Sequence, residues 1–173
     1  VADILDVEAL NAVFDAADFD AVMHFAAFIA AGASMAQPHL YYRNNVTGSL
    51  TLIKAAVMHG VPKFVFSSSA GVYASKDAPL TEADPIGPVS VYGHTKRVIE
   101  EILSWFHRIH GLRYTALRYF NAAGATPPDR GEAHYPETHL IPLVLQVPLG
   151  QRDKVFIFGD DYPTRDGPCE RDY

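Results

Sequence analysis

The order of apolar segments along the chain constrains the fold more than any other feature of the sequence. Short apolar runs with the length of strands cover residues 20–27, 64–66 and 112–119. Segments with apolar residues at helical spacing, residues 46–57 and 92–109, separate these runs. Strands that alternate with helices over short connections form parallel sheets. The sequence therefore predicts an α/β fold with a parallel sheet that is covered by helices on both faces.

The charge and the cysteine content argue against several classes of protein. The 173 residues carry a formal net charge of -6 and no basic cluster, so we expect no general binding to nucleic acid. The single cysteine, Cys169, leaves no internal disulfide. No run approaches the roughly 18 apolar residues of a membrane span. No secretion signal opens the chain. We therefore expect no membrane contact and a cytoplasmic location.

The histidines do not predict a metal site. His107 and His110 lie three residues apart on the second helical segment, but no cluster of further ligands is near them in the sequence. His24 lies inside the first apolar run, where a packed core histidine is more common than a ligand. We expect no bound metal.

The composition changes after residue 124. Prolines and glycines punctuate residues 125–136, which indicates a loop and a crossing into a second lobe. A short apolar helix over residues 140–149 and a strand over residues 155–158 are expected in that lobe. The chain is therefore predicted to divide into residues 1–124 and residues 125–173.

A serine, a tyrosine and a lysine form the candidate reactive group. Ser69 follows the central apolar run, and Tyr92 and Lys96 lie four residues apart at the start of the next helix. Residues four apart share one helix face, so both side chains can point to a serine at the end of a neighbouring strand. A Tyr-x-x-x-Lys pair alone is weak evidence, because chance produces such pairs. Its position after a serine-ended strand predicts a proton-transfer site.

Seven stretches, in order along the chain, carry a family resemblance. They are residues 24–27, 41–46, 64–69, 72–73, 92–96, 117–121, and 158–163 together with 171–173. These stretches resemble the extended short-chain dehydrogenase/reductase family, and within it the UDP-glucose 4-epimerases. The resemblance implies part of a doubly wound, Rossmann-type parallel sheet, with NAD across the carboxyl ends of its strands. Residues 1–124 would be an incomplete NAD-binding domain, and residues 125–173 an incomplete sugar-nucleotide lobe.

The resemblance also implies roles for individual residues. The cofactor would contact Asp3, Ile4, Phe25, Ala26, Ala27, Asn44, Ser69, Tyr92, Lys96 and Phe120. The UDP-sugar would contact Ser69, Tyr92, Asn121, His139, Phe156, Ile157, Phe158 and Arg171. The Arg171 guanidinium would supply charge to the pyrophosphate. Ser69, Tyr92 and Lys96 would be the catalytic residues.

The implied activity is the NAD-dependent 4-epimerisation of a UDP-hexose, UDP-glucose or UDP-galactose, through a transient 4-keto intermediate. Such an isomerase would belong to galactose metabolism. Tyr92 would act as the base. A phenol has a pKa of about 10, so the Lys96 ammonium and the positive nicotinamide ring would be needed to favour the phenolate. Ser69 would hydrogen-bond the same sugar oxygen and help to relay the proton.

Two kinds of alternative stay open. One is another nucleotide-sugar enzyme of the same scaffold, such as a pentose epimerase, a decarboxylase or a 4,6-dehydratase. Ala70-Gly71-Val72 after Ser69 disfavours a dehydratase, because dehydratases usually carry an acidic pair there. The other alternative is a non-catalytic fragment or binding module. It is suggested by the lack of a glycine-rich phosphate loop, since the closest glycines, Gly87 and Gly93, are too far apart.

The ends of the chain depart from the family pattern. We expect an internal fragment that lacks the N-terminal glycine-rich loop and the C-terminal end, and that is inactive by itself.

The full-length protein is expected to be a homodimer. One helix face is expected to be buried, against the sheet or against a partner subunit. It comprises Val46, Leu50, Ile53 and Val57 of one helix with Val98, Ile102 and Phe106 of the other.

Overall fold

A computed structural model describes residues 1–126, 131 and 135–170. The chain divides into two compact units, Val1–Tyr119 and Phe120–Tyr173. The functional roles predicted for the two parts of the chain stay a prediction. Each unit is described by itself below.

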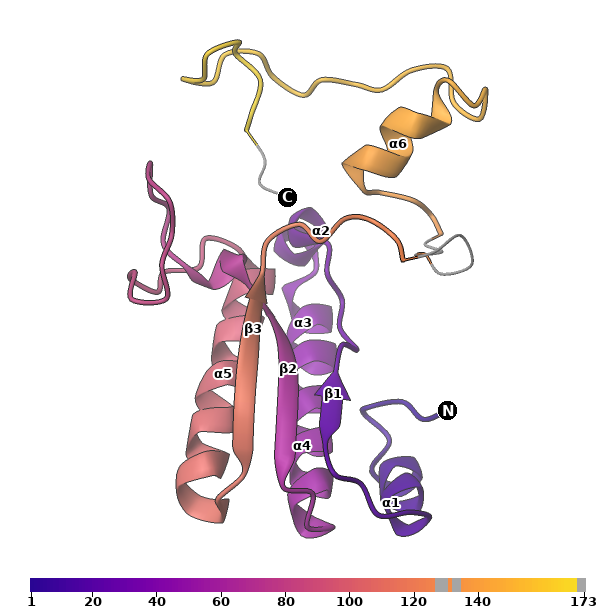
Figure 1. The fold of residues 1–173 in the computed structure, drawn as a ribbon, viewed down its shortest axis with the longest axis vertical. Helices are drawn as coiled ribbons and strands as arrows, with labels where there is room; N and C mark the ends of the chain where they lie inside the picture. Colours follow the sequence, from indigo (N-terminus) through magenta and orange to yellow (C-terminus); the bar gives the residue numbers. More distant parts are fainter. Residues whose placement is uncertain (127–130, 132–134, 171–173) are drawn as a thin grey trace. The chain divides into compact units, whose positions relative to one another are not determined.

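The first unit is built on a parallel sheet of three strands. These are β1 (Val22–His24), β2 (Lys63–Ser69) and β3 (Arg113–Tyr119), in the order β1-β2-β3 (Figure 1). Both pairs of strands are parallel. The parallel sheet predicted from the sequence is confirmed. β1 is shorter than its apolar run, because the chain leaves the sheet after His24.

Three long helices carry local sequence signals at their ends. Helix α1 (Val7–Asp15) begins after Asp6, whose carboxylate accepts a hydrogen bond from the Ala9 N–H at 2.9 Å. Helix α5 (Val91–His110) begins after Ser90, which caps the Gly93 N–H in the same way. Helix α4 spans Gly48–Met58. Gly60 and Gly111 take positive φ angles directly after α4 and α5, as residues that end helices do.

One hydrophobic core joins these helices to one face of the sheet. Alternate residues of β2, Phe64 and Phe66, are buried in it. The core comprises Leu10, Phe14, Leu52, Ile53, Ala55, Ala56, Val61, Phe64, Phe66, Ile99, Leu103 and Leu112. Met23 and Leu117, on strands of the same sheet, are exposed. Helices α1, α4 and α5 all pack in one core on one face of the sheet, so helices over the second face stay a prediction.

The helix face predicted to be buried is buried in part within this chain. On α4 the buried residues include Leu52, Ile53 and Ala56, whereas Leu50 is 40% exposed. On α5, Ile99 and Leu103 are buried. Of the predicted residues Ile53 is buried, and Val46, Val57, Val98, Ile102 and Phe106 are partly buried, so burial of this face against a partner subunit stays a prediction. Apolar residues lie on several sides of α4, so the spacing of a few of them could not identify the inner face.

The helical segment before α4 is continuous but irregular. Helices α2 (Ala31–Ala36) and α3 (Pro38–Tyr41) precede a π-helical segment, Tyr42–Thr47, which runs directly into α4. π-Helical segments are rare in proteins, and those that occur often lie at functional sites. A short 3₁₀ turn, Ala70–Val72, follows β2. Hydrophobic periodicity predicted neither of the two irregular segments.

The second unit contains one helix in its described part. Helix α6 spans Leu140–Gln146, inside the range predicted from the sequence. The strand predicted over residues 155–158 is not formed, because these residues have no strand partners among the described residues. Among the described residues, no helix of either unit is both long and apolar enough to cross a membrane.

Candidate functional site

The structure brings together the three residues predicted to transfer protons. Ser69 is the last residue of β2, and Tyr92 lies in the first turn of α5. The Ser69 side chain lies close enough to Tyr92 to lower the pKa of its phenol. The Lys96 Nζ lies 5.6 Å from the centroid of the Tyr92 ring and donates a hydrogen bond to the Ser67 carbonyl at 2.7 Å. The predicted grouping of the three side chains is therefore present in the fold.

Two glycines allow the helix to come this close to the strand end. A Cβ atom added to Gly93 would overlap the Gly71 carbonyl oxygen, which belongs to the backbone. The backbone of the first turn of α5 thus rests against the 3₁₀ turn that follows Ser69. This contact sets the distance between Tyr92 and Ser69.

Burial controls the charges of the tyrosine and the lysine. Lys96 is only 2% exposed, and its desolvation lowers its pKa to about 8. Burial raises the pKa of Tyr92, while the nearby Ser69 side chain opposes the rise. The protein by itself therefore keeps the Tyr92 phenol neutral near pH 7. A phenolate would require a further positive charge beside the ring.

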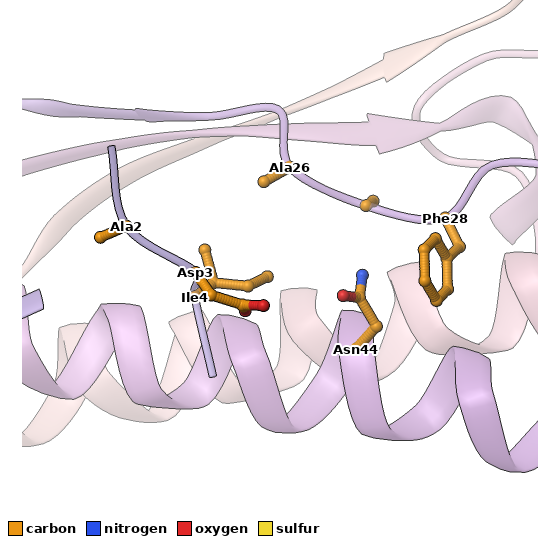
Figure 2. Close-up of a pocket in the computed structure, with 7 residues that line it drawn as sticks. Ala2, Asp3, Ile4, Ala26, Phe28 and Asn44 are labelled. Atoms are coloured by element: carbon orange, nitrogen blue, oxygen red, sulfur yellow. The ribbon is translucent and has the colours of Figure 1, made fainter. Parts of the chain in front are cut away.

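A pocket of about 220 Å³ opens beyond the carboxyl end of β1 (Figure 2). It is lined by Ala2, Asp3, Ile4, Ala26, Ala27, Phe28 and Asn44. Five residues predicted to contact the cofactor are among them: Asp3, Ile4, Ala26, Ala27 and Asn44. Phe25, also predicted, is exposed and does not line the pocket. The lining combines apolar walls with one carboxylate and one amide.

A buried asparagine holds the wall of this pocket. The Asn45 Oδ1 accepts a hydrogen bond from the Phe28 N–H at 2.8 Å, and its Nδ2 donates to the Phe28 carbonyl at 3.0 Å. The same Nδ2 donates to the Thr95 Oγ1 at 3.2 Å, and Thr95 lies beside Lys96 on α5. Asn45 lies in the π-helical segment. It thereby connects the pocket with the helix that carries Tyr92.

Sequence reasoning missed Asn45, Ala2 and Phe28. The resemblance assigned only Asn44 of the Asn44-Asn45 pair to the site. The local sequence gives no sign that the buried Asn45 amide bonds to two other segments, at Phe28 and at Thr95. Phe28 directly follows the predicted run 25–27, and this adjacency was the available signal.

Apart from Ser69 and Tyr92, the predicted sugar-nucleotide residues lie in the second unit, and all of these contacts stay a prediction. The His139 Nδ1 is 2.8 Å from the Glu137 Oε1. The rings of Phe156 and Phe158 lie 6.2 Å apart, and the side chains of Phe156, Ile157 and Phe158 are exposed. The predicted contacts at Phe120 and Asn121 belong to the same unit. Arg171 lies outside the described residues.

Two histidines of the first unit, His24 and His107, make polar contacts within the fold. The His24 Nε2 lies 2.7 Å from the Ser49 Oγ, and its ring packs against Phe64 and Phe66. The prediction of a packed core histidine is confirmed. The His107 Nδ1 lies 3.0 Å from the Leu112 carbonyl. In the part of the chain that the structure describes, no three His, Cys, Asp or Glu residues group as metal ligands would.

Comparison with known proteins places this geometry in a family. The model of the NAD dependent epimerase/dehydratase family matches residues 1–173. The UDP-glucose 4-epimerase of Halalkalibacterium halodurans is 52% identical over 173 residues, 99% of this chain and 52% of that protein. The crystal structure of UDP-glucose 4-epimerase from Brucella ovis in complex with NAD matches with a TM-score of 0.91 at 41% identity, over 97% of this chain and 52% of that chain.

A second solved structure gives the same result. UDP-glucose 4-epimerase from Bifidobacterium longum in complex with NAD+ and UDP has a TM-score of 0.90 at 38% identity, over 96% of this chain and 51% of that chain. The chain thus spans about half the length of the relatives that it matches. Matches of this extent, together with the parallel sheet and the Ser-Tyr-Lys group, show that the chain belongs to the NAD-dependent epimerase/dehydratase family.

Proposed function

We propose that the protein carrying this chain catalyses the NAD-dependent 4-epimerisation of a UDP-hexose. The observation that carries the proposal is the grouping of Ser69, Tyr92 and Lys96 at the carboxyl end of β2. The similarity to proteins named UDP-glucose 4-epimerase supports the choice of substrate. No residue with a carboxylate follows Ser69 in the 3₁₀ turn Ala70–Val72, which disfavours a dehydratase.

The pocket beyond β1 fits one end of the cofactor. Its apolar walls suit a planar ring, and the Asp3 carboxylate can accept a hydrogen bond from an exocyclic amine. The position beyond the carboxyl ends of parallel strands is where nucleotides bind in such sheets. Asp3, Ile4, Ala26, Ala27 and Asn44 would hold this end. When bound, NAD supplies a hydride acceptor and donor together with a positive ring.

Tyr92 is proposed to take the proton of the sugar 4-hydroxyl. Burial alone favours the neutral phenol, so the reaction requires the positive charges of the nicotinamide ring and of Lys96 to lower the pKa of Tyr92. Below a pH of about 8 Lys96 carries its proton. Ser69, close to Tyr92, is placed to contact the same sugar oxygen and to relay the proton. The transient product at the sugar would be a 4-keto group.

The UDP part is proposed to bind the residues of the second unit. These are Asn121, His139, Phe156, Ile157, Phe158 and Arg171, with Ser69 and Tyr92 at the sugar. Aromatic and aliphatic side chains as exposed as Phe156, Ile157 and Phe158 offer apolar surface that a uracil ring can cover.

A homodimer formed through α4 and α5 is proposed as the assembly. These helices expose several large apolar side chains, among them Leu50, Met58, Trp105 and Ile109. Exposed apolar side chains gathered on neighbouring elements are typical of interaction surfaces.

The activity is tested with the protein expressed together with any sequence that flanks this chain in its gene. The purified protein is incubated separately with UDP-glucose, a UDP-pentose and a UDP-uronic acid, and the products are identified by nuclear magnetic resonance. We expect UDP-glucose to be converted to UDP-galactose and the other two compounds to react more slowly. Faster turnover of the pentose or loss of carbon dioxide from the uronic acid would replace the proposal with an alternative from the same scaffold.

A further inference from the structure

Glu100 is a buried carboxylate that the proposed chemistry does not use. It is 5% exposed and lies on α5, one turn after Lys96 and two turns after Tyr92. Residues at this spacing share one helix face. Glu100 therefore lies on the same face as the two reactive residues, farther along the helix.

Both oxygens of the Glu100 carboxylate are engaged by side chains of the sheet. Oε1 accepts hydrogen bonds from the Ser68 Oγ at 2.6 Å and the Arg118 Nε at 3.0 Å. Oε2 accepts from the Arg118 Nη2 at 2.8 Å, which completes a bidentate pair. The Arg97 Nη1 lies 3.8 Å from the same oxygen. The Arg118 guanidinium itself lies 4.7 Å from the centroid of the Tyr73 ring.

The partners of Glu100 lie on two neighbouring strands at one level of the sheet. Ser68 on β2 is paired in register with Arg118 on β3. One carboxylate on α5 thus holds both strands one residue before their ends. Because bidentate pairs fix orientation as well as distance, this contact restricts sliding and rotation of the helix.

Three consecutive serines of β2 lie beside three turns of α5. Ser69 lies near Tyr92, the Ser67 carbonyl accepts a hydrogen bond from Lys96, and the Ser68 hydroxyl donates one to Glu100. The reactive residues therefore meet the strand on both sides of the Glu100 contact. A displacement of α5 at Glu100 would change the geometry at Tyr92.

Stability alone gives a weak reason for a buried charge pair here. Replacing such a pair by apolar residues of similar volume is often neutral or stabilising, because burial of two charges is costly. Specifying a single arrangement of packed elements is a role that apolar residues fill less well.

We propose that Glu100 is a positioning residue, which holds α5 against β2 and β3 so that Tyr92 and Lys96 meet Ser69 in reactive geometry. The inference rests on the proposed function for its kinetic consequence. The positioning role itself applies to any reaction that uses Ser69, Tyr92 and Lys96.

The kinetic test compares Glu100→Ala and Glu100→Gln with Glu101→Ala in the protein that carries this chain with its flanking sequence. Glu101 is the matched control, since its carboxylate binds Arg97 at 2.9 Å on the exposed side of the same helix. For Glu100→Ala we expect kcat to fall about a hundredfold with KM for the UDP-sugar changed little, because misplacement of about 1 Å can cost that much. Glu100→Gln keeps one oxygen for Ser68 but loses the second contact to Arg118, and its kcat is expected to lie between those of Glu100→Ala and the parent. Glu101→Ala is expected to keep the parent kcat.

A second readout does not require activity. Tyrosine carrying a carbon isotope at Cζ is incorporated, and the Tyr92 resonance is assigned by its loss in Tyr92→Phe. In Glu100→Ala this resonance is expected to move towards its position in Ser69→Ala, where the Ser69 hydroxyl is removed, and to stay in place in Glu101→Ala.

The outcomes separate the two proposals. A parent protein without epimerase activity, combined with the expected resonance shift, would remove the proposed function and keep the positioning role. A folded Glu100→Ala protein with kcat within about twofold of the parent and an unmoved Tyr92 resonance would overturn the positioning role. If Glu100→Ala does not fold, Ser68→Ala removes one contact without leaving an unpaired charge, and the same two measurements decide.

Discussion

Lys96 and Tyr92 respond to burial in opposite directions, and both responses favour neutral side chains. The pKa of Lys96 falls to about 8 and that of Tyr92 rises. If Tyr92 is the base, as proposed, a neutral phenol at rest would stay inactive until a positive group binds beside it. In the proposed reaction this would couple proton transfer to binding of the cofactor.

Replacing Tyr92 by phenylalanine tests the assignment of the base. Only the hydroxyl is lost, so the ring still packs beside Lys96. We expect the rate of UDP-glucose and UDP-galactose interconversion to fall by about a hundredfold or more, because removal of a general base typically has this effect. Tyr114→Phe, on β3 and packed against the core, is the control and should keep the parent rate. A Tyr92→Phe protein that retains more than about a tenth of the activity contradicts the assignment.

His24 makes stability depend on pH in the acidic range. Its burial, with a smaller effect of Lys96, lowers its pKa from 6.5 to about 4. Between these values the unfolded chain binds a proton that the folded protein does not, so stability rises with pH there and is lost as pH falls from 6.5 to 4. The loss amounts to about 3 kcal/mol.

Urea unfolding of the parent and of His24→Gln at pH 7, 5.5 and 4, values that bracket the titration, measures this contribution. The variant is expected to be less stable at pH 7 and to lose less stability on acidification than the parent. His110→Gln, at the exposed end of α5, is the control. Equal slopes in the parent and in His24→Gln would show that His24 does not contribute.

At the scale of elements, the contact between α5 and the turn after β2 depends on two glycines. Gly93→Ala would place a Cβ against the Gly71 carbonyl, which is backbone and cannot move without shifting the turn. We expect the free energy of unfolding to fall by about 1–3 kcal/mol, which is the usual cost of overpacking. Activity should fall by a larger proportion, because Tyr92 lies in the first turn of α5 and would move with it.

Gly32→Ala on α2 is the matched control for this prediction. A Cβ there meets no atom within 4 Å, so the substitution is expected to be neutral or slightly stabilising in a helix. Chemical unfolding measures the stabilities, and the UDP-sugar assay measures the activities. A Gly93→Ala protein with the stability and activity of Gly32→Ala would show that the close approach has no role.

Elements with strong local signals were predictable from the sequence, and elements held by tertiary contacts were not. The apolar runs and Gly60 and Gly111 located the strands and the ends of α4 and α5. The spacing of the apolar residues of α4 did not single out the side that faces the core, because these residues lie on several sides of the helix. The π-helical segment depends on Asn45 and its partners far along the chain, which no local pattern encodes.

The same distinction holds for the candidate site. The spacing of Tyr92 and Lys96 is local, so the sequence alone placed both on one face beside Ser69. The residues of the pocket proposed for the cofactor were predicted only through the resemblance, because Asp3, Ala26 and Asn44 come from three segments that the fold brings together. Glu100 was missed, since a glutamate on a helix is usually exposed.

At the scale of the whole molecule, NAD binding requires more than the pocket beyond β1. The phosphates of a dinucleotide are ordinarily met by N–H groups at a helix start behind a glycine-rich turn. The glycines of this sequence are too widely spaced for such a turn. We expect the isolated 173-residue chain to bind NAD with a Kd in the millimolar range or weaker, or about -4 kcal/mol.

Isothermal titration of the isolated chain with NAD measures this affinity. The same titration with the flanking sequence present is the comparison, and it should give much tighter binding. A micromolar Kd for the isolated chain would mean that the phosphates have another binding site in residues 1–173.

The parallel pairing of the strands also sets how the chain folds. Partners in register, such as Val22 with Phe64 and Phe64 with Tyr114, are about 40 to 50 positions apart. During synthesis β2 leaves the ribosome long before β3 and the helix whose Ile99 and Leu103 cover Phe64 and Phe66. Contacts between residues so far apart in the sequence form slowly, and the apolar strands stay exposed to solvent until these contacts form. Chaperones that shield nascent apolar segments should therefore determine how much of this protein reaches its native state in the cell.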